Sequence, residues 1–295
     1  MADLAPSRVL DDPAKIVNAM SVDVEDYFQV QAFANVVSPA QWDSFDCRVE
    51  PNIERILMQF EAHGVHGTFF TLGWIAKRYP SMVRRIVAGG HELASHGFGH
   101  QPIYSLTPGG FRADVRRARE LLEDIGGVAV TGYRAPTFSM GPRTPWAHAL
   151  LEEAGYRYSS SIYPILHDLY GDPSGPRFAY RVVESAMWEI PMTTVRIGSR
   201  NLPCAGGGYF RLLPYRLFRT GVRHLNRGER KPAVFYFHPW EVDPAQPRMA
   251  GASALARFRH DVNLGAMSGR LDQLLHDFQW DRMDRVFERC WNAED

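Results

Sequence analysis

Short apolar segments alternate with amphipathic segments through the first half of the chain, and this alternation constrains the fold more than any other feature. Apolar runs predict strands at residues 16–24, 66–72 and 91–95, just before 134, near 156 and at 233–237. Amphipathic spacing predicts helices at residues 51–64, 81–88, 111–125 and 144–153. Because strands that are joined through helices pair in parallel, we expect an α/β protein built from parallel βα units.

The composition is that of a globular protein with a large core. The 295 residues are 45% hydrophobic and 22% charged, with 33 basic and 33 acidic side chains. A net charge of zero gives no chain-wide attraction to nucleic acid or to anionic lipid, so neither is expected as a partner. The cysteines Cys47, Cys204 and Cys290 are odd in number and form no Cys-x-x-Cys pattern, which argues against a disulfide framework and a thiolate metal site.

The chain is expected to fold as a single domain over residues 16–295, after a polar leader at residues 1–15. The leader lacks the basic start and apolar core of a secretory signal, and no run of 18 apolar residues follows it. We therefore expect a cytoplasmic protein without a transmembrane segment, whose contact with the inner membrane is at most peripheral. Residues 171–230 are rich in Pro and Gly and are predicted to form a loop-rich insertion.

Acidic and imidazole side chains follow two of the predicted strands. Asp23, Glu25 and Asp26 stand at the end of the first strand, and His96 and His100 come directly after the third. The carboxyl ends of parallel strands meet at one edge, where βα barrels carry their active sites. Two neutral histidines and one carboxylate leave a divalent metal free positions for water and substrate. The pattern indicates a metal-dependent hydrolase, although histidine pairs at this spacing also occur on helix faces and in satisfied cores.

Four short motifs resemble those of the polysaccharide deacetylases of carbohydrate esterase family 4, and they occur in the family's order. They are Asp23–Asp26, Gly90–His100, Arg134–Pro136 and Phe237–His238, and the resemblance covers roughly residues 19–241. It implies the fold of that family's NodB homology domain, a distorted (β/α) barrel, with the loop-rich insertion added to it.

The loop Gly206–Arg211 resembles the corresponding loop of a family subgroup that is found with bacterial exopolysaccharide and exosortase (PEP-CTERM) loci. Residues 160–290 are therefore expected to form a C-terminal region specific to that subgroup. The resemblance implies a metal-dependent N-deacetylase that removes acetyl groups from N-acetylated sugars of an exopolysaccharide or its precursor, through attack of a metal-activated water. The substrate would be a saccharide or a lipid-linked sugar. Zinc is the default metal, and cobalt, nickel or iron suit the same ligands.

The resemblance also implies roles for the residues of the first three motifs. Asp23 would be the general base, with Arg134 beside it to keep the carboxylate ionised. His96 and His100 would bind the metal together with one carboxylate, from Glu25 or Asp26. Asp26 is preferred because it keeps the family's usual residue type.

The remaining roles concern the oxyanion, the leaving group and the sugar. A backbone N–H at Thr137 or Phe138 would bind the oxyanion, and His238 would be the general acid for the departing amine. The family orients this histidine with an aspartate of a fourth motif that this chain lacks, so Glu241 or Asp243 would replace it. Flat surfaces for sugar rings are expected from aromatic side chains, namely Trp240, Tyr209, Phe138, Tyr133 and Trp188.

Two alternatives stay open at this point. Related folds with altered acids in the first motif hydrolyse other amides, and Glu25 is such an alteration, so a non-sugar or cyclic amide is a second candidate substrate. The missing aspartate of the fourth motif leaves a degenerate carbohydrate-binding protein as the non-enzymatic alternative. Retention of the base, the histidine pair, the arginine and the acid argues against that alternative.

Overall fold

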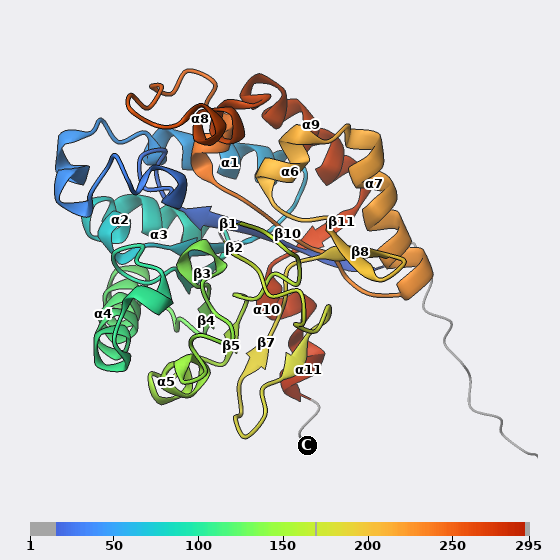
Figure 1. Ribbon diagram of the computed structural model, residues 1–295, viewed down its shortest axis with the longest axis horizontal. Coiled ribbons are helices and arrows are strands. Elements are labelled where there is room, and N and C mark those ends of the chain that lie inside the picture. The colour runs from blue at the N-terminus through green and yellow to red at the C-terminus, as the bar shows by residue number, and fades with distance from the viewer. Residues whose placement is uncertain (1–15, 169, 293–295) are drawn as a thin grey trace, which may run out of the picture.

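A curled, half-barrel sheet forms the centre of the molecule (Figure 1). The computed structural model describes residues 16–168 and 170–292, so the predicted leader at residues 1–15 lies outside the described part. The strands run in the order β10-β1-β2-β3-β4-β5-β7-β6, and β11 pairs with the start of β1. Neighbours along this order are parallel except β6 and β7. The predicted α/β class with parallel βα units is therefore confirmed.

Most strands are short, and those of the first half coincide with the predicted segments. The sheet comprises β1 (Val17–Val24), β2 (Thr68–Thr71), β3 (Glu92–Ser95), β4 (Gly132–Tyr133), β5 (Tyr158–Ser159), β6 (Tyr180–Arg181), β7 (Trp188–Glu189), β10 (Val234–Phe237) and β11 (Gln279–Asp281). A separate antiparallel hairpin is formed by β8 (Thr194–Ile197) and β9 (Arg200–Pro203). The parallel strands bring the residues that follow β1, β3, β4 and β10 to one edge of the sheet.

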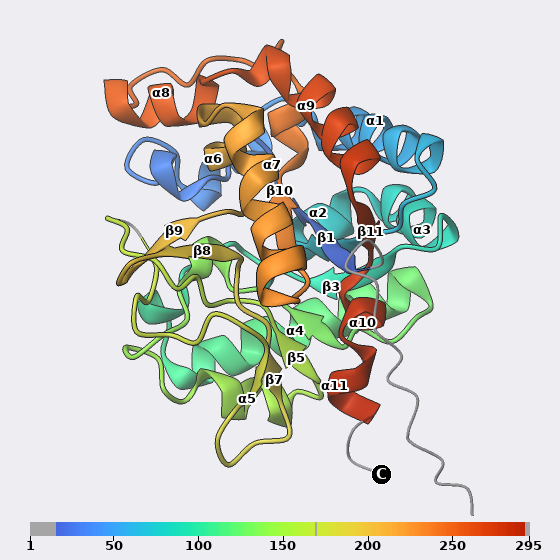
Figure 2. The same cartoon turned by 90° about the vertical axis from the view of Figure 1, so that its right-hand side faces the viewer.

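Helices cover the outside of the sheet and its carboxyl edge. They are α1 (Val49–Ala62), α2 (Gly73–Arg78), α3 (Pro80–Ala88), α4 (Pro108–Gly126), α5 (Ala147–Glu153), α6 (Gly207–Leu212), α7 (Tyr215–Arg223), α8 (Ala254–Asp261), α9 (Leu264–Asp277), α10 (Met283–Val286) and α11 (Glu288–Asn292). In Figure 2, α8 and α6 lie at the same end of the molecule as the segment that follows β1. This end holds the cavity described below.

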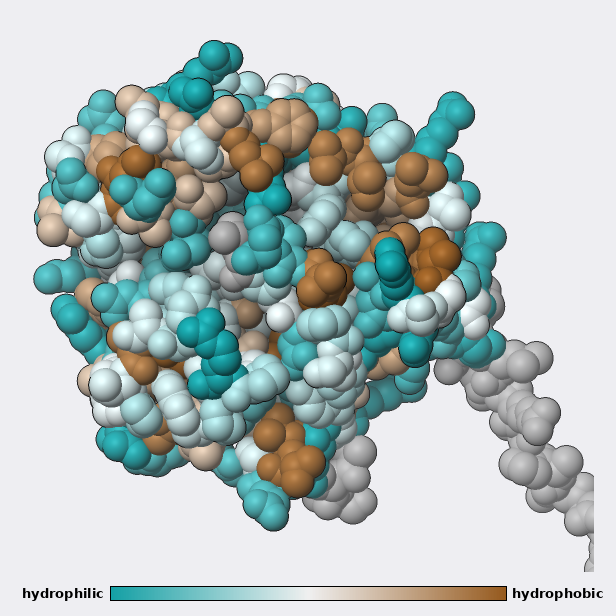
Figure 3. Space-filling model, in the orientation of Figure 1, coloured by the Kyte–Doolittle hydropathy of each residue, from teal (hydrophilic) through white to brown (hydrophobic). Residues whose placement is uncertain are grey.

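The surface mixes polar and apolar side chains. On the face drawn in Figure 3, hydrophobic side chains form separate patches among hydrophilic ones. No helix in the described part of the chain is long and apolar enough to cross a membrane.

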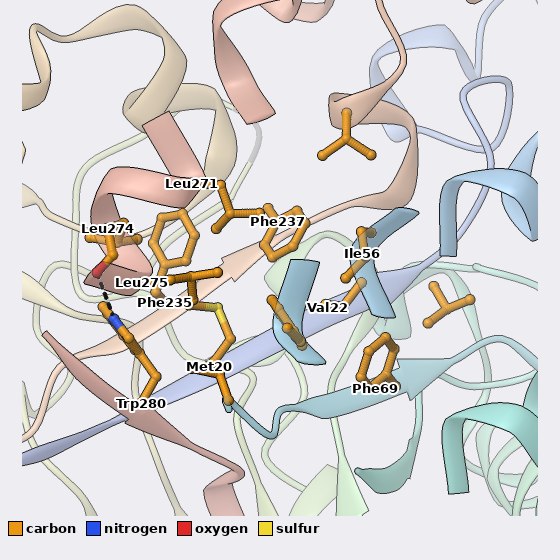
Figure 4. Close-up of a cluster of buried hydrophobic side chains, with 14 of the residues drawn as sticks. Met20, Val22, Ile56, Phe69, Phe235, Phe237, Leu271, Leu274, Leu275 and Trp280 are labelled. Carbon is orange, nitrogen blue, oxygen red and sulfur yellow. Dashed lines mark hydrogen bonds between the residues drawn. The ribbon is translucent and has the colours of Figure 1, made fainter. Parts of the chain in front are cut away.

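Alternation along β1 separates an outer core from the interior of the half-barrel. Met20 and Val22 pack with Phe235 and Phe237 of β10 beneath α1 and α9 (Figure 4). The intervening Ser21 is buried on the other face, where its hydroxyl donates to a carbonyl of β10. A one-residue shift of register would exchange these two faces, so the apolar pattern fixes which side chains enter the interior.

The prediction of a loop-rich insertion at residues 171–230 is wrong in part. The segment contains β6 to β9, α6, α7 and a π-helical turn at His224–Glu229. Phe210 of α6 and Phe218 and Val222 of α7 belong to the main hydrophobic core. Two-residue strands and short helices of this kind are stabilised by tertiary packing, so local sequence patterns do not reveal them.

Glu92 of β3 is a buried carboxyl group within the half-barrel. It accepts hydrogen bonds from Thr68 Oγ1 at 2.6 Å, Tyr158 Oη at 2.8 Å and the N–H of Asp284 at 3.2 Å. Burial, followed by the nearby charge of Asp284, raises its pKa from 4.5 to about 7. The folded protein therefore keeps this proton up to about pH 7, whereas the unfolded chain loses it above pH 4.5.

Replacing Glu92 with glutamine is expected to flatten the pH dependence of stability. Because the folded pKa is the higher one, the wild type should lose up to about 3 kcal/mol of unfolding free energy as pH rises from 5 to 8, and the neutral variant should not. Urea unfolding at several pH values measures this, with Glu120→Gln on the exposed face of α4 as the control. Equal slopes in wild type and Glu92→Gln would show that Glu92 titrates normally.

Candidate active site

Three buried side chains converge at the carboxyl edge of the sheet. Glu25 follows β1, and His96 and His100 follow β3. One oxygen or nitrogen atom from each of the three lies within 4.8 Å of the other two. Gly97, with φ of 74°, and His100, with φ of 50°, curl the segment after β3 back on itself, which leaves the two imidazole rings 5.3 Å apart.

His96 and Glu25 are in protonation states that suit metal ligands. His96 Nδ1 lies 2.8 Å from the carbonyl oxygen of Arg134, which can only accept, so Nδ1 carries the hydrogen and Nε2 keeps its lone pair. Burial lowers the pKa of His96 to about 4, which keeps the ring neutral. Burial raises the pKa of Glu25, but His100 and His238 outweigh it and bring the pKa to about 2, so the carboxyl group is ionised.

Glu25 also shows an unsatisfied atom where a cation fits. Its Oε2 lies 2.7 Å from His100 Nε2, yet the two atoms do not meet in hydrogen-bond geometry, and Oε2 has no hydrogen-bond partner among the described residues. Because a buried carboxylate oxygen rarely stays unpaired, a cation bound at this point would satisfy Oε2. Glu25, His96 and His100 together supply a His, His, Glu donor set of the kind that binds a divalent metal.

Asp26 lies apart from this trio, which corrects the preference for it as the carboxylate ligand. Its Oδ1 accepts the N–H of Tyr27 at 2.8 Å, and its Oδ2 accepts the N–H groups of Arg48 at 2.6 Å and Val49 at 2.9 Å. Both oxygens are thus used to bind backbone at the start of α1, where the helix dipole also favours a negative charge. Glu25 is the acidic residue that lies with the histidines.

Arg134 holds Asp23 in place at the cavity that the trio lines. Its Nη1 donates to Asp23 Oδ1 at 2.6 Å and to Ser21 Oγ at 2.9 Å. Its other nitrogens donate to the carbonyl and hydroxyl oxygens of Ser160, and its guanidinium lies 4.0 Å from the centre of the Phe70 ring. Since Arg134 is fully buried, these contacts compensate its charge and fix the Asp23 carboxylate.

His238 lines the same cavity, with its Nε2 3.5 Å from Glu25 Oε1, and is held by Glu241. Glu241 Oε1 accepts from Nδ1 of His238 at 2.8 Å and from its backbone N–H at 3.0 Å, while Oε2 accepts from Arg211 Nε at 2.7 Å. Burial alone would lower the pKa of His238, but Glu25 and Glu241 raise it to about 9. Of the two predicted substitutes for the missing aspartate, Glu241 contacts the histidine, whereas Asp243 pairs with Arg48.

The two candidates for the oxyanion N–H differ in what they already bind. The N–H of Phe138 donates to the carbonyl of Ala135 at 3.1 Å, which favours Thr137. Thr137 has φ of 56° and Phe138 has φ of 46°, both in the left-handed region that residues with a side chain rarely adopt. Such backbone strain clusters at ligand-binding positions.

A cavity of about 180 Å³ joins these groups. Its lining includes Asp23, Glu25, His96, His100, Thr137, Phe138, His238 and Trp240. The predicted sugar-binding Tyr209 lines an adjoining pocket instead. Tyr133 packs in the outer core, and Trp188 of β7 packs inside the half-barrel, so neither lines this cavity.

Several lining residues carry no sequence signal that would have identified them. Arg211, Tyr170 and His260 come from three separate segments of the chain and meet only through the fold. His260 stacks on Trp240 at 4.1 Å, and Trp240 stacks on His238 at 5.1 Å. The Gly-rich loop before Arg211 was the one hint, because it resembled a family motif.

Comparisons with known proteins place the fold and this cavity in a family. A family model for polysaccharide deacetylases matches residues 40–159, and a model for a domain of unknown function, DUF3473, matches residues 160–288. The chain therefore contains a polysaccharide deacetylase domain of the NodB type, carbohydrate esterase family 4.

Individual relatives agree with this assignment. A peptidoglycan deacetylase of Helicobacter pylori is 29% identical over 113 residues, which are 38% of this chain and 38% of the relative. A chitooligosaccharide deacetylase of Sinorhizobium fredii is 34% identical over 31% of this chain and 41% of the relative. The matches thus span well under half of these relatives. A solved structure from Mycobacterium smegmatis, assigned to the polysaccharide deacetylases, shares the fold with a TM-score of 0.62 at 20% identity, over 99% of this chain and 96% of that one.

Proposed function

We propose that the protein is a metal-dependent N-deacetylase that removes acetyl groups from N-acetylated sugars of an exopolysaccharide or its precursor. The observation that carries the proposal is the convergence, in one cavity, of the Glu25, His96 and His100 trio with an arginine-held Asp23 and a glutamate-held His238. Amide hydrolysis requires an activated water, a base, oxyanion stabilisation and an acid for the leaving amine, and each requirement has a candidate here. The named relatives that act on peptidoglycan and chitooligosaccharides support a sugar amide.

Glu25, His96 and His100 would hold the metal. A divalent ion bound by them would polarise the amide carbonyl and activate the attacking water. Zinc is the first candidate, because two imidazoles and a carboxylate with free positions form a common catalytic zinc site. The hydrogen bond from His96 Nδ1 to the carbonyl of Arg134 would fix that ring in its binding orientation.

Asp23 would take the proton from the attacking water. The Arg134 contact at 2.6 Å occupies Asp23 Oδ1 and leaves Oδ2 as the oxygen for proton transfer. Ser21 and Ser160 also accept hydrogen bonds from the guanidinium, which fixes the position of Arg134 and therefore that of the Asp23 carboxylate. The backbone N–H of Thr137 would donate to the developing oxyanion.

His238 would deliver the proton to the departing amine from Nε2. Glu241 binds Nδ1, which orients the ring with Nε2 toward the cavity and favours the protonated form. Arg211 keeps Glu241 ionised through its 2.7 Å contact. In this arrangement Glu241 would do what an aspartate of the fourth motif does in relatives.

Changing His238 to alanine is expected to lower turnover by about 10²-fold or more while the metal stays bound, because His238 is assigned to proton transfer and not to ligation. Metal content and acetate release are measured on the same preparation. His276→Ala on the exposed face of α9 serves as the matched control. Loss of the metal in His238→Ala would instead make His238 a ligand.

The proposal is tested by product analysis. The full chain is incubated with N-acetylglucosamine oligomers and, separately, with cyclic amides, and acetate and new amine are quantified. Equal amounts of acetate and free amine from the sugars support the proposal. Hydrolysis of a cyclic amide without any reaction of the sugars would contradict it and favour the second candidate substrate.

A further inference from the structure

We propose that one face of the protein docks onto the surface of an anionic lipid bilayer. This docking face consists of the β8–β9 hairpin, the loop at residues 164–168 and α8. In Figure 2 the hairpin and α8 project from the same side of the molecule, at the left. Asn201 Nδ2 of β9 donates to the carbonyl of Pro164 at 3.0 Å, and Arg259 Nη1 of α8 contacts Asp168 at 2.9 Å. The loop therefore joins the hairpin and α8 into one surface.

Positive charge is concentrated in the two segments that supply the hairpin and α8. Residues 190–228 contain seven arginines, residues 244–260 contain three, and neither segment contains Asp or Glu. Because the net charge of the whole chain is zero, the balancing acidic side chains lie in other segments. The composition excludes an attraction to anionic lipid that acts on the whole chain, but this uneven distribution creates a local one.

Four arginines of the docking face are available to bind phosphate groups. Arg196 and Arg200 flank the turn of the hairpin, and Arg248 and Arg257 line a surface pocket beside α8. All four are exposed and form no ion pair with the residues that the structure describes. Asp261 lines the same pocket, but two arginines outnumber its one carboxylate. Guanidinium groups bind phosphate oxygens through paired hydrogen bonds, which suits them to lipid headgroups.

Exposed apolar side chains lie beside these arginines. Ile197 at the hairpin turn is 62% exposed, Leu255 and Phe258 of α8 are each 55% exposed, and Leu166 in the loop is 88% exposed. In Figure 3, hydrophobic side chains at the upper right lie over the hairpin and the neighbouring α6 and α7, with hydrophilic ones between them. Surfaces that bind membranes peripherally insert such apolar side chains between the headgroups while their cations bind the phosphates.

An anionic bilayer fits this pattern better than a second copy of the chain. In a symmetric dimer the docking face would meet itself, so the unpaired arginines of the two copies would approach one another. A bilayer instead offers phosphates to the arginines and acyl chains to Ile197 and Phe258. Ala256 and Arg259 of α8 also line the reaction cavity, so a docked bilayer would lie at the edge of that cavity.

The test is sedimentation of the full chain with phosphatidylcholine vesicles that do or do not contain phosphatidylglycerol. We expect binding to the anionic vesicles and much weaker binding to the neutral ones. The double variant Arg196→Gln/Arg200→Gln should weaken binding by about 25-fold, because each arginine near an anionic surface contributes about 5-fold. Its matched control is Arg84→Gln/Arg289→Gln, which removes two exposed arginines of α3 and α11 outside the docking face.

A second variant tests the apolar contribution. Ile197→Asn should weaken binding to the anionic vesicles at low and at high salt, because insertion of an apolar side chain is not screened by ions. Met58→Asn on α1, which is 67% exposed, is the control and should bind like the wild type. Thermal unfolding of each variant checks that the fold is retained.

Three results would overturn the proposal: no binding of the wild type to the anionic vesicles, an equal loss of binding in the Arg84→Gln/Arg289→Gln control, or a lipid-free dimer that Ile197→Asn dissociates. The last would show that a second copy covers the docking face, and analytical ultracentrifugation detects it. Because none of these measurements involves acetate release, the proposal does not depend on the proposed function, and either can fail without the other.

Discussion

Replacement of either His96 or His100 with alanine is expected to remove metal binding and deacetylation together. The proposed ligand atoms of Glu25, His96 and His100 lie within 4.8 Å of one another, and a site with three protein ligands rarely stays occupied at low metal when one is lost. Metal content after dialysis and acetate release from N-acetylglucosamine oligomers are measured on each variant.

The control for this experiment is His224→Ala, whose side chain is about half exposed in the π-helical turn. It should keep both metal and activity. Full activity of His96→Ala or His100→Ala under metal-depleted conditions would remove the trio from the mechanism. Thermal unfolding of each variant without metal checks that the fold is retained.

Asp23→Asn is expected to lower turnover by about 10²- to 10⁴-fold while metal and sugar still bind. Asparagine has the same shape and can accept from Arg134, but its amide cannot take a proton from water. The carboxylate sits 2.6 Å from Arg134 and next to the trio, so only its basicity changes. Single-turnover acetate release, with metal and sugar titrations, separates catalysis from binding.

The matched control for Asp23→Asn is Asp43→Asn, an exposed aspartate that pairs with Arg78. It should turn over like the wild type. Near-normal turnover of Asp23→Asn with bound sugar would mean that another group acts as the base. Loss of metal in this variant would make Asp23 a ligand.

The first half of the fold could be predicted from the sequence because each element there carries its own periodic pattern. The alternation of Met20 and Val22 with Ser21 on β1, and the apolar face of α4, are local signals that survive in the folded protein. The segment at residues 171–230 lacks such signals. Its strands β6 and β7 have two residues each and exist because neighbouring strands pair with them.

Some residues of the candidate site could likewise be predicted from the sequence, and others could not. Asp23, the histidine pair and Arg134 could be named because they lie at or just after the carboxyl ends of predicted strands and because their motifs resemble those of the family. The choice between Glu25 and Asp26 could not be made, because it depends on Asp26 accepting N–H groups from the start of α1, 22 residues later. The role of Arg211 could not be predicted either, because it depends on a contact with Glu241 that only the fold creates.

The most direct test of the central claim is a metal titration of acetate release from an N-acetylglucosamine oligomer by chelated protein. We predict that release stops on chelation and returns in proportion to added zinc, cobalt or nickel, up to about one ion per chain. Undiminished release from protein shown to be metal-free would contradict the claim. So would a chain that binds one ion tightly yet releases no acetate from any N-acetylated sugar.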